Sequence, residues 1–131
     1  MTAAVYLDAS AFVKLIRAEA ESEALRDWLV SHRERTSSAL LRTEVLRAVR
    51  LGHASDLTWA RELLEAVVLV PIDDTVLEAA GLLDPGALRT LDAIHLATAS
   101  YLGPDVDALV TYDRRMIEAA GRLGLPVASP T

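Results

Sequence analysis

The stretch Ala3-Ala4-Val5-Tyr6-Leu7-Asp8 places an acidic residue directly after a short apolar run of strand-forming side chains. This run predicts a buried strand, and Ser10–Arg17 follows it with the spacing of a helix. A second run of the same kind, Ala108–Thr111, is followed two residues later by Asp113. Because the carboxyl ends of parallel strands meet at one edge of a sheet, we expect Asp8 and Asp113 to lie close together.

The rest of the chain repeats this alternation of apolar strand-like runs and longer stretches of helical period. The pattern predicts a three-layer α/β/α fold with a central, mainly parallel sheet of four to five strands. No repeat or low-complexity segment interrupts it, so we expect one domain over residues 1–131. Further strands are predicted at Thr36–Ser38, Val67–Pro71 and Val127–Ser129, and further helices at Glu21–Ser31, Leu40–Leu51, from Ser55 as N-cap to Ala66, from Asp73 or Asp74 to Leu83, Thr90–Tyr101 and Arg114–Leu123.

Composition limits the chemistry that the chain can carry. There is no cysteine, which excludes disulfides, zinc–thiolate sites and thiol nucleophiles and leaves oxygen ligands. Apolar runs such as Val67–Ile72 are far shorter than the roughly 20 residues of a membrane-spanning helix, and no signal-peptide pattern opens the sequence. We therefore expect a cytoplasmic protein with no membrane contact. The net charge of −6 disfavours nucleic acid, but bound divalent ions would reverse the field around an acidic site.

Two more acidic residues stand on helices in positions that suggest a role beyond solubility. Asp92 lies in the first turn of a helix that is apolar nearly all round, and only Arg89 is near enough to pair with it. Glu44 lies at the margin of the apolar stripe of its helix. Each acidic residue also has a simpler explanation, as an N-cap (Asp8, Asp113), as a charge that complements a helix dipole (Asp92) or as the exposed partner of Arg47 (Glu44).

Four segments taken together resemble the motifs of PIN-domain ribonucleases, in the same order along the chain. They are Tyr6-Leu7-Asp8-Ala9-Ser10-Ala11, Arg42-Thr43-Glu44-Val45-Leu46-Arg47, Leu91-Asp92-Ala93-Ile94-His95-Leu96-Ala97-Thr98-Ala99 and Val110-Thr111-Tyr112-Asp113-Arg114. More narrowly, the chain resembles the VapC toxins of bacterial VapBC toxin–antitoxin pairs. The resemblance covers essentially the whole chain, and the DAIHLATA stretch is its most specific part.

The resemblance implies a Mg²⁺-dependent endoribonuclease in which Mn²⁺ can replace Mg²⁺. Its implied catalytic residues and metal ligands are Asp8, Glu44, Asp92 and Asp113, with Ser10 and Thr111 as hydroxyl-bearing neighbours that orient them. It also implies an RNA substrate, a VapB-like antitoxin whose arginine enters the acidic cleft, and a homodimer that forms around Trp28 or Trp59. The chain departs from many relatives after Asp113, because Arg114 and Arg115 follow and the nearest acidic residue is Glu118.

Two other functions stay open at this point. A non-catalytic α/β binding module would use the same carboxylates only as helix caps and would bind no Mn²⁺. A phosphate-receiving signalling domain also groups acidic residues at strand ends, and Asp73 and Asp74 fit that pattern. It needs a lysine after a late strand, however, and Lys14 is the only lysine in the chain. His95, one turn after Asp92, is expected to pack in the core, with a hydrogen bond to Asp92 as the alternative.

Overall fold

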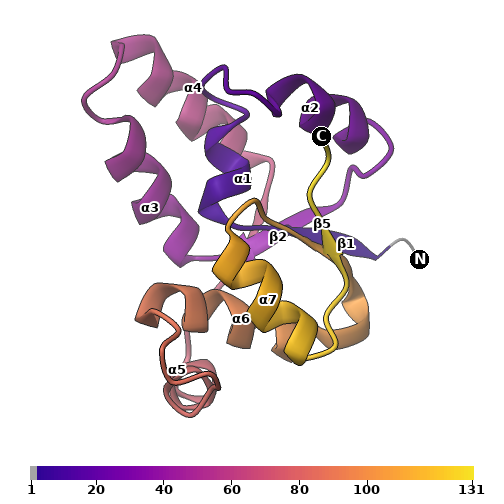
Figure 1. Cartoon of the computed structure of the whole chain (residues 1–131). Helices are drawn as coiled ribbons and strands as arrows, with labels where there is room; N and C mark the ends of the chain where they lie inside the picture. Colours follow the sequence, from indigo (N-terminus) through magenta and orange to yellow (C-terminus); the bar gives the residue numbers. More distant parts are fainter. Residues whose placement is uncertain (1–2) are drawn as a thin grey trace.

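The computed structural model describes residues 3–131 and places a five-stranded sheet between two layers of helices (Figure 1). The sheet order is β3-β2-β1-β4-β5, and every neighbouring pair is parallel. The predicted three-layer α/β/α fold with a parallel sheet is confirmed. The strands are β1 (Ala4–Leu7), β2 (Arg35–Ser38), β3 (Val68–Val70), β4 (Val106–Val110) and β5 (Val127–Ala128). The helices are α1 (Ala9–Val13), α2 (Ser22–Leu29), α3 (Leu40–Val49), α4 (Ala54–Glu65), α5 (Asp74–Gly81), α6 (Thr90–Leu102) and α7 (Arg114–Arg122), with a 3₁₀ turn at Gly103–Asp105.

The alternation of side chains along β1 explains the two helical layers. Val5 and Leu7 pack into a cluster with buried residues of α1, α2, α3 and α4, whereas Tyr6 packs on the other face with residues of α6 and α7. Figure 1 shows α1–α4 on one side of the sheet and α5–α7 on the other. Both faces of the sheet are therefore covered, as a parallel sheet requires. Within residues 3–131, no helix is long and apolar enough to cross a membrane.

The carboxyl ends of β1 and β4 meet at the point where the strand order changes direction. From β1 the chain adds β2 and then β3 on one side, and later adds β4 and β5 on the other. The backbone N–H of Asp8 donates to the carbonyl of Val110, with an N···O distance of 3.2 Å. Such a switch point leaves a crevice between the connecting segments and is the usual ligand site of an open parallel sheet.

Most predicted boundaries lie within two residues of the observed ones, and two differences at helix ends have a clear local cause. The first helix ends at Val13 and not at Arg17, because the N–H groups of Lys14, Leu15 and Ile16 bond to the carbonyl three residues back and tighten the chain. The fourth helix begins at Ala54 after His53, and His53 makes no side-chain capping bond, so Ser55 lies inside the helix and is not its N-cap. Neither change moves a strand end at the switch point.

The end of α7 depends on a glycine in the left-handed region. Gly124 has a φ of 73°, and the N–H groups of Leu125 and Gly124 donate to the carbonyls of Ala120 and Gly121 at 3.0 and 3.1 Å. We expect Gly124→Ala to lower the free energy of unfolding by about 1–2 kcal/mol, because a Cβ is disfavoured in this conformation. Gly121→Ala is the matched control, since its Cβ would meet open space within a helix, and it should raise stability by about 0.5 kcal/mol. Urea unfolding would measure both changes, and equal effects would contradict the prediction.

Candidate functional site

Asp8 is the most buried of the four predicted acidic residues, with 3% of its surface exposed. Its Oδ1 accepts hydrogen bonds from the Ser10 hydroxyl at 2.7 Å and the Ala11 N–H at 3.0 Å, and its Oδ2 accepts one from the Thr111 hydroxyl at 2.5 Å. Burial raises the pKa of Asp8, and the bond from Thr111 is the largest effect that opposes the rise. Three donors hold the carboxylate in one orientation, but burial still disfavours its ionised form.

Asp113 is the N-cap of α7 and is tied to Asp8 through Thr111. Its Oδ1 accepts from the N–H groups of Arg115 at 2.8 Å and Met116 at 3.3 Å. The N–H of Asp113 donates to the same Thr111 hydroxyl that bonds Asp8, at 3.2 Å. Capping therefore explains only the contacts of Oδ1, because the second carboxylate oxygen, Oδ2, does not take part in the cap. The threonine brings together two acidic residues that are more than one hundred positions apart in the sequence.

Asp92 is joined to Asp113 by an arginine. The Nε of Arg89 lies 3.3 Å from Oδ2 of Asp92, and its Nη2 lies 3.3 Å from Oδ2 of Asp113. Asp92 stands in the first turn of α6, and its side chain is 15% exposed. The pairing with Arg89 that its position suggested is therefore present, and it extends to a second carboxylate on another helix.

Glu44 is held by His95, a contact that the sequence did not reveal. The Nε2 of His95 lies 2.5 Å from Oε1 of Glu44, and its Nδ1 lies 2.7 Å from the hydroxyl of Tyr6. His95 is buried, with 1% of its surface exposed, so its expected packing role is present, but it does not bond Asp92. Burial raises the pKa of Tyr6, which keeps the phenol protonated. In the tautomer that carries its proton on Nε2, the ring donates to the Glu44 carboxylate and orients it, while Nδ1 accepts from the Tyr6 hydroxyl.

The predicted residues thus form two connected groups. Asp8, Asp113 and Asp92 are linked through Thr111 and Arg89, while Glu44 is linked to His95, which is three residues after Asp92 on α6. In the conformation described for residues 3–131, no three Asp, Glu or His side chains are placed to share a metal ion. The donor set still fits a hard divalent cation, because its ligand atoms are carboxylate oxygens. A cationic group, the Arg89 guanidinium, already lies between two of them.

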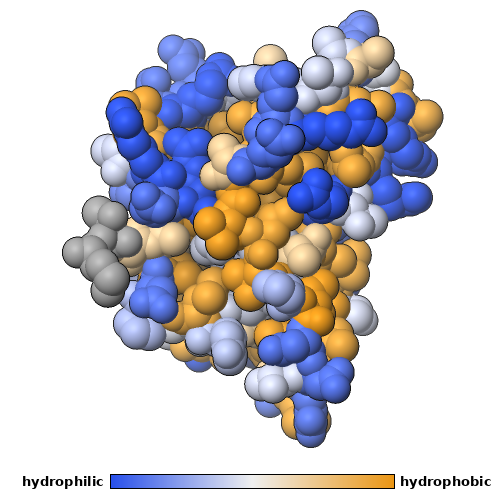
Figure 2. Space-filling view, turned by 180° about the vertical axis from the view of Figure 1, so that it is seen from behind, coloured by the Kyte–Doolittle hydropathy of each residue, from blue (hydrophilic) through white to orange (hydrophobic). Residues whose placement is uncertain are grey.

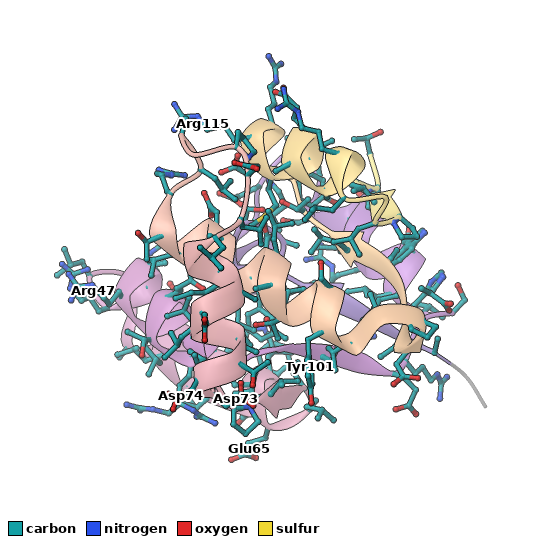
Figure 3. The ribbon with its side chains drawn as sticks, turned by 90° about the horizontal axis from the view of Figure 1, so that it is seen from below. Arg47, Glu65, Asp73, Asp74, Tyr101 and Arg115 are labelled. Carbon is teal, nitrogen blue, oxygen red and sulfur yellow. The ribbon has the colours of Figure 1, made fainter. Side chains whose placement is uncertain are left out.

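The surroundings of the acidic site combine a cavity with exposed arginines. A cavity of about 440 Å³ lies beside it, lined by Pro85, Ala87, Leu88, Arg115, Glu118 and Ala119. In Figure 3, Arg47 on α3 and Arg115 on α7 point outward on either side of the N-terminal end of α6. Glu118, the acidic residue nearest after Asp113, pairs with Arg122 at 3.0 Å in an exposed position. In the part of the chain described, it shares no hydrogen-bond partner with the four predicted acidic residues.

Comparison with known proteins identifies the family. A family model for the PIN domain matches residues 5–122, so the chain belongs to the PIN-domain family. Within that family it belongs to the VapC group. It is 50% identical over 129 residues to a Mycobacterium tuberculosis protein named ribonuclease VapC46, covering 98% of this chain and 99% of that one. It is 37% identical over 131 residues to ribonuclease VapC47 of the same species, covering 96% of each.

Solved structures agree on the fold at low sequence identity. The crystal structure of M. tuberculosis VapC20, described as a Sarcin-Ricin loop cleaving toxin, is similar with a TM-score of 0.74 at 17% identity, covering 88% of this chain and 95% of that chain. A toxin–antitoxin complex from Klebsiella pneumoniae is similar with a TM-score of 0.76 at 20% identity, covering 98% of both chains. The family assignment argues against the phosphate-receiving signalling domain.

Proposed function

We propose that this protein is a Mg²⁺-dependent endoribonuclease that acts as the toxin of a toxin–antitoxin pair. The observation that carries the proposal is the meeting of Asp8, Asp92 and Asp113 at the switch point of the sheet, linked through Thr111 and Arg89. The names of the relatives support the same activity, because two proteins that this chain matches over nearly its full length are named ribonucleases.

The four acidic residues would hold the metal, directly or through water. A bound divalent ion lowers the pKa of a water molecule and stabilises charge on a phosphodiester that is being cleaved. The chain itself supplies orientation. Ser10 and Thr111 fix Asp8, the start of α7 fixes Asp113, and His95 fixes Glu44. Because all of these contacts except the exposed cap of Asp113 are buried or part-buried, little reorganisation is needed when the site is used.

RNA is the substrate class that the charges around the site favour. The carboxylates would repel a phosphate backbone, but exposed arginines on or next to the elements that carry the carboxylates would attract one. These are Arg42, Arg47, Arg50, Arg89, Arg114 and Arg115. Arginine suits this role because its planar fork matches phosphate oxygens. An RNA strand bound across the site would therefore contact basic side chains from α3, from the segment before α6 and from α7.

Partners follow from the same assignment. The similarity to a toxin–antitoxin complex supports a VapB-like antitoxin, whose arginine would pair with the carboxylates that otherwise hold the metal. A homodimer is a second part of the proposal.

Figure 2, which shows the molecule from behind the view of Figure 1, has hydrophobic residues across the middle of that face. Of the two tryptophans considered, Trp59 is the better candidate for an interface, because 46% of its surface is exposed, whereas the Trp28 ring stacks on His32 with a centroid distance of 3.7 Å.

The direct test of this function is RNA cleavage by purified, antitoxin-free protein. Total RNA is incubated with the protein and Mg²⁺ or Mn²⁺, with Asp113→Asn and a chelator as controls, and the cut ends are mapped. Discrete new ends that depend on both the metal and Asp113 are the expected result. The proposal would be wrong if cleavage continued in the presence of chelator, or if Asp113→Asn cleaved RNA as fast as the wild-type protein. Absence of both cleavage and Mn²⁺ binding would favour the non-catalytic binding module.

A metal site also predicts a difference in thermal stability that does not depend on activity. At a Mn²⁺ concentration of about ten times its Kd, binding should stabilise wild-type protein by about 1.4 kcal/mol, or about 4–6 °C in Tm. If Asp8→Asn weakens binding about tenfold, the same Mn²⁺ concentration should raise its Tm by only about 1–2 °C. Differential scanning fluorimetry with and without metal measures both shifts. Equal shifts in the two proteins would count against Asp8 as a ligand.

A further inference from the structure

Arg89 has a position that the proposed reaction does not yet explain. Among the lysines and arginines of residues 3–131, it alone forms ion pairs with any of the four acidic residues. Its two contacts reach Oδ2 of Asp92 and Oδ2 of Asp113, which come from different helices. A single guanidinium therefore pairs with two of the four acidic residues proposed as metal ligands, from within the same chain.

These contacts are weak enough to be exchanged. Both are 3.3 Å long, whereas strong charge-assisted hydrogen bonds are about 2.7–2.9 Å. The Arg89 side chain is 61% exposed, and exposed ion pairs are screened by water and salt. Arg89 stands at the N-cap position of α6 and makes no side-chain capping bond. Its side chain can leave by rotation about its own bonds while α6 stays in place.

A divalent cation that binds Asp92 and Asp113 must compete with Arg89 for the same oxygen atoms. The ion carries twice the charge of the guanidinium, so it gains more from the two carboxylates. The released arginine remains tethered three residues before Asp92, next to Leu88 and the cavity that Leu88 lines with Arg115. There it meets any phosphate that approaches the metal, and its fork can bind two phosphate oxygens at once.

From this geometry we infer that Arg89 is an exchangeable cation of the site: it occupies Asp92 and Asp113 in the metal-free protein and binds an RNA phosphate once a divalent ion displaces it. The inference rests on the proposed function, which it extends by naming a substrate-binding residue. It predicts two opposite effects of removing the guanidinium. Metal should bind more tightly, because its competitor is gone. RNA should be cleaved with a lower kcat/KM, because a phosphate contact is lost.

Isothermal titration with Mn²⁺ alone tests the first effect. In Arg89→Ala we expect a Kd about three- to tenfold lower than in wild type, the range that two weak exposed ion pairs account for. Arg122→Ala is the matched control. The Arg122 side chain is 60% exposed and also forms an ion pair, but its partner is Glu118, which is not one of the four proposed metal ligands. Both variants remove one positive charge, so a difference between them is due to position. Circular dichroism verifies that both are folded.

Cleavage kinetics at saturating Mn²⁺ test the second effect, with a randomised pool of short single-stranded RNA as the probe. Arg89→Ala should lower kcat/KM about tenfold, mainly through KM, as expected when one charge-assisted phosphate contact is lost. The slope of log kcat/KM against log salt should become shallower by about 0.7, the value for one phosphate contact on a single strand. Arg89→Lys keeps the charge and should restore the slope, although not the full rate.

The outcomes separate this inference from the function on which it rests. If Arg89→Ala has the same Mn²⁺ affinity as Arg122→Ala, or the same salt slope, Arg89 is not the exchangeable cation and the inference is wrong. If Asp113→Asn abolishes cleavage in the same assays, the proposed function stands regardless of that result. If instead Asp113→Asn cleaves like wild type, the acidic site is not the reaction centre, and the proposed function fails together with the inference.

Discussion

Replacing Asp8 with asparagine is expected to lower the rate of RNA cleavage at least about a hundredfold while leaving the fold in place. A metal ion contributes several kcal/mol to the stabilisation of a phosphodiester transition state, and each factor of ten in rate is about 1.4 kcal/mol. Asparagine has the size of aspartate and can still accept from Ser10 and Ala11, while Thr111 can turn its hydroxyl to accept from the new amide. The substitution therefore removes charge and little else.

The chain offers a matched control for this substitution at Asp73. Like Asp8, Asp73 is the N-cap of a helix, and its Oδ1 accepts from the N–H three residues later, at 2.9 Å. It is exposed at the start of α5, and Figure 3 shows it on the side of the molecule away from Arg115. Asp73→Asn should cleave RNA at the wild-type rate. Similar losses in both variants would mean that capping, and not a role in the reaction, explains the effect at Asp8.

His95→Leu is expected to lower the cleavage rate about 10- to 100-fold, the usual loss when a group that orients a metal ligand is removed. Leucine fills most of the space but cannot donate to Glu44 or bond the Tyr6 hydroxyl. The carboxylate of Glu44 would then be free to rotate. Leaving the buried phenol without this partner should also lower the free energy of unfolding by about 1–3 kcal/mol.

A rescue variant distinguishes orientation of Glu44 from a general loss of stability. Glutamine has a side-chain NH₂ that can donate to Glu44, so His95→Gln should recover part of the rate that His95→Leu loses. Both rates are measured at a temperature at which urea or thermal unfolding shows each variant to be fully folded. Equal activity of the leucine and glutamine variants would indicate that His95 only fills space in the core.

The strand ends and their acidic residues were accessible from the sequence because they depend on local patterns. Apolar runs of strand-forming residues predicted β1 and β4, and the residues after them predicted helix starts at Asp8 and Asp113. The same reasoning overextended α1 to Arg17. The residues Leu15 and Ile16 continue the apolar pattern, but they pack against the core from a tightened turn and not from a helix. Apolar periodicity reports burial, and burial does not require a regular helix.

The partners of His95 and the second contact of Arg89 could not be read in this way. Glu44 and His95 are 51 positions apart, and nothing on either helix indicates that their side chains meet. Core packing is what the sequence predicts for His95, and a bond to Asp92 is the alternative only because both residues lie on one helix at a spacing of three. Arg89 could be matched with Asp92 for the same reason, but not with Asp113, which is 24 positions away.

Local patterns along the chain were enough to predict the layered parallel fold, the acidic residues at strand ends and helix starts, and the family resemblance. These follow from hydrophobic period, capping chemistry and short motifs, all of which act over a few neighbouring residues. Three contacts became visible only in the folded molecule: Thr111 joins Asp8 to Asp113, His95 contacts Glu44, and Arg89 bridges Asp92 and Asp113. Those contacts depend on how helices pack across the sheet and which side-chain conformations that packing permits.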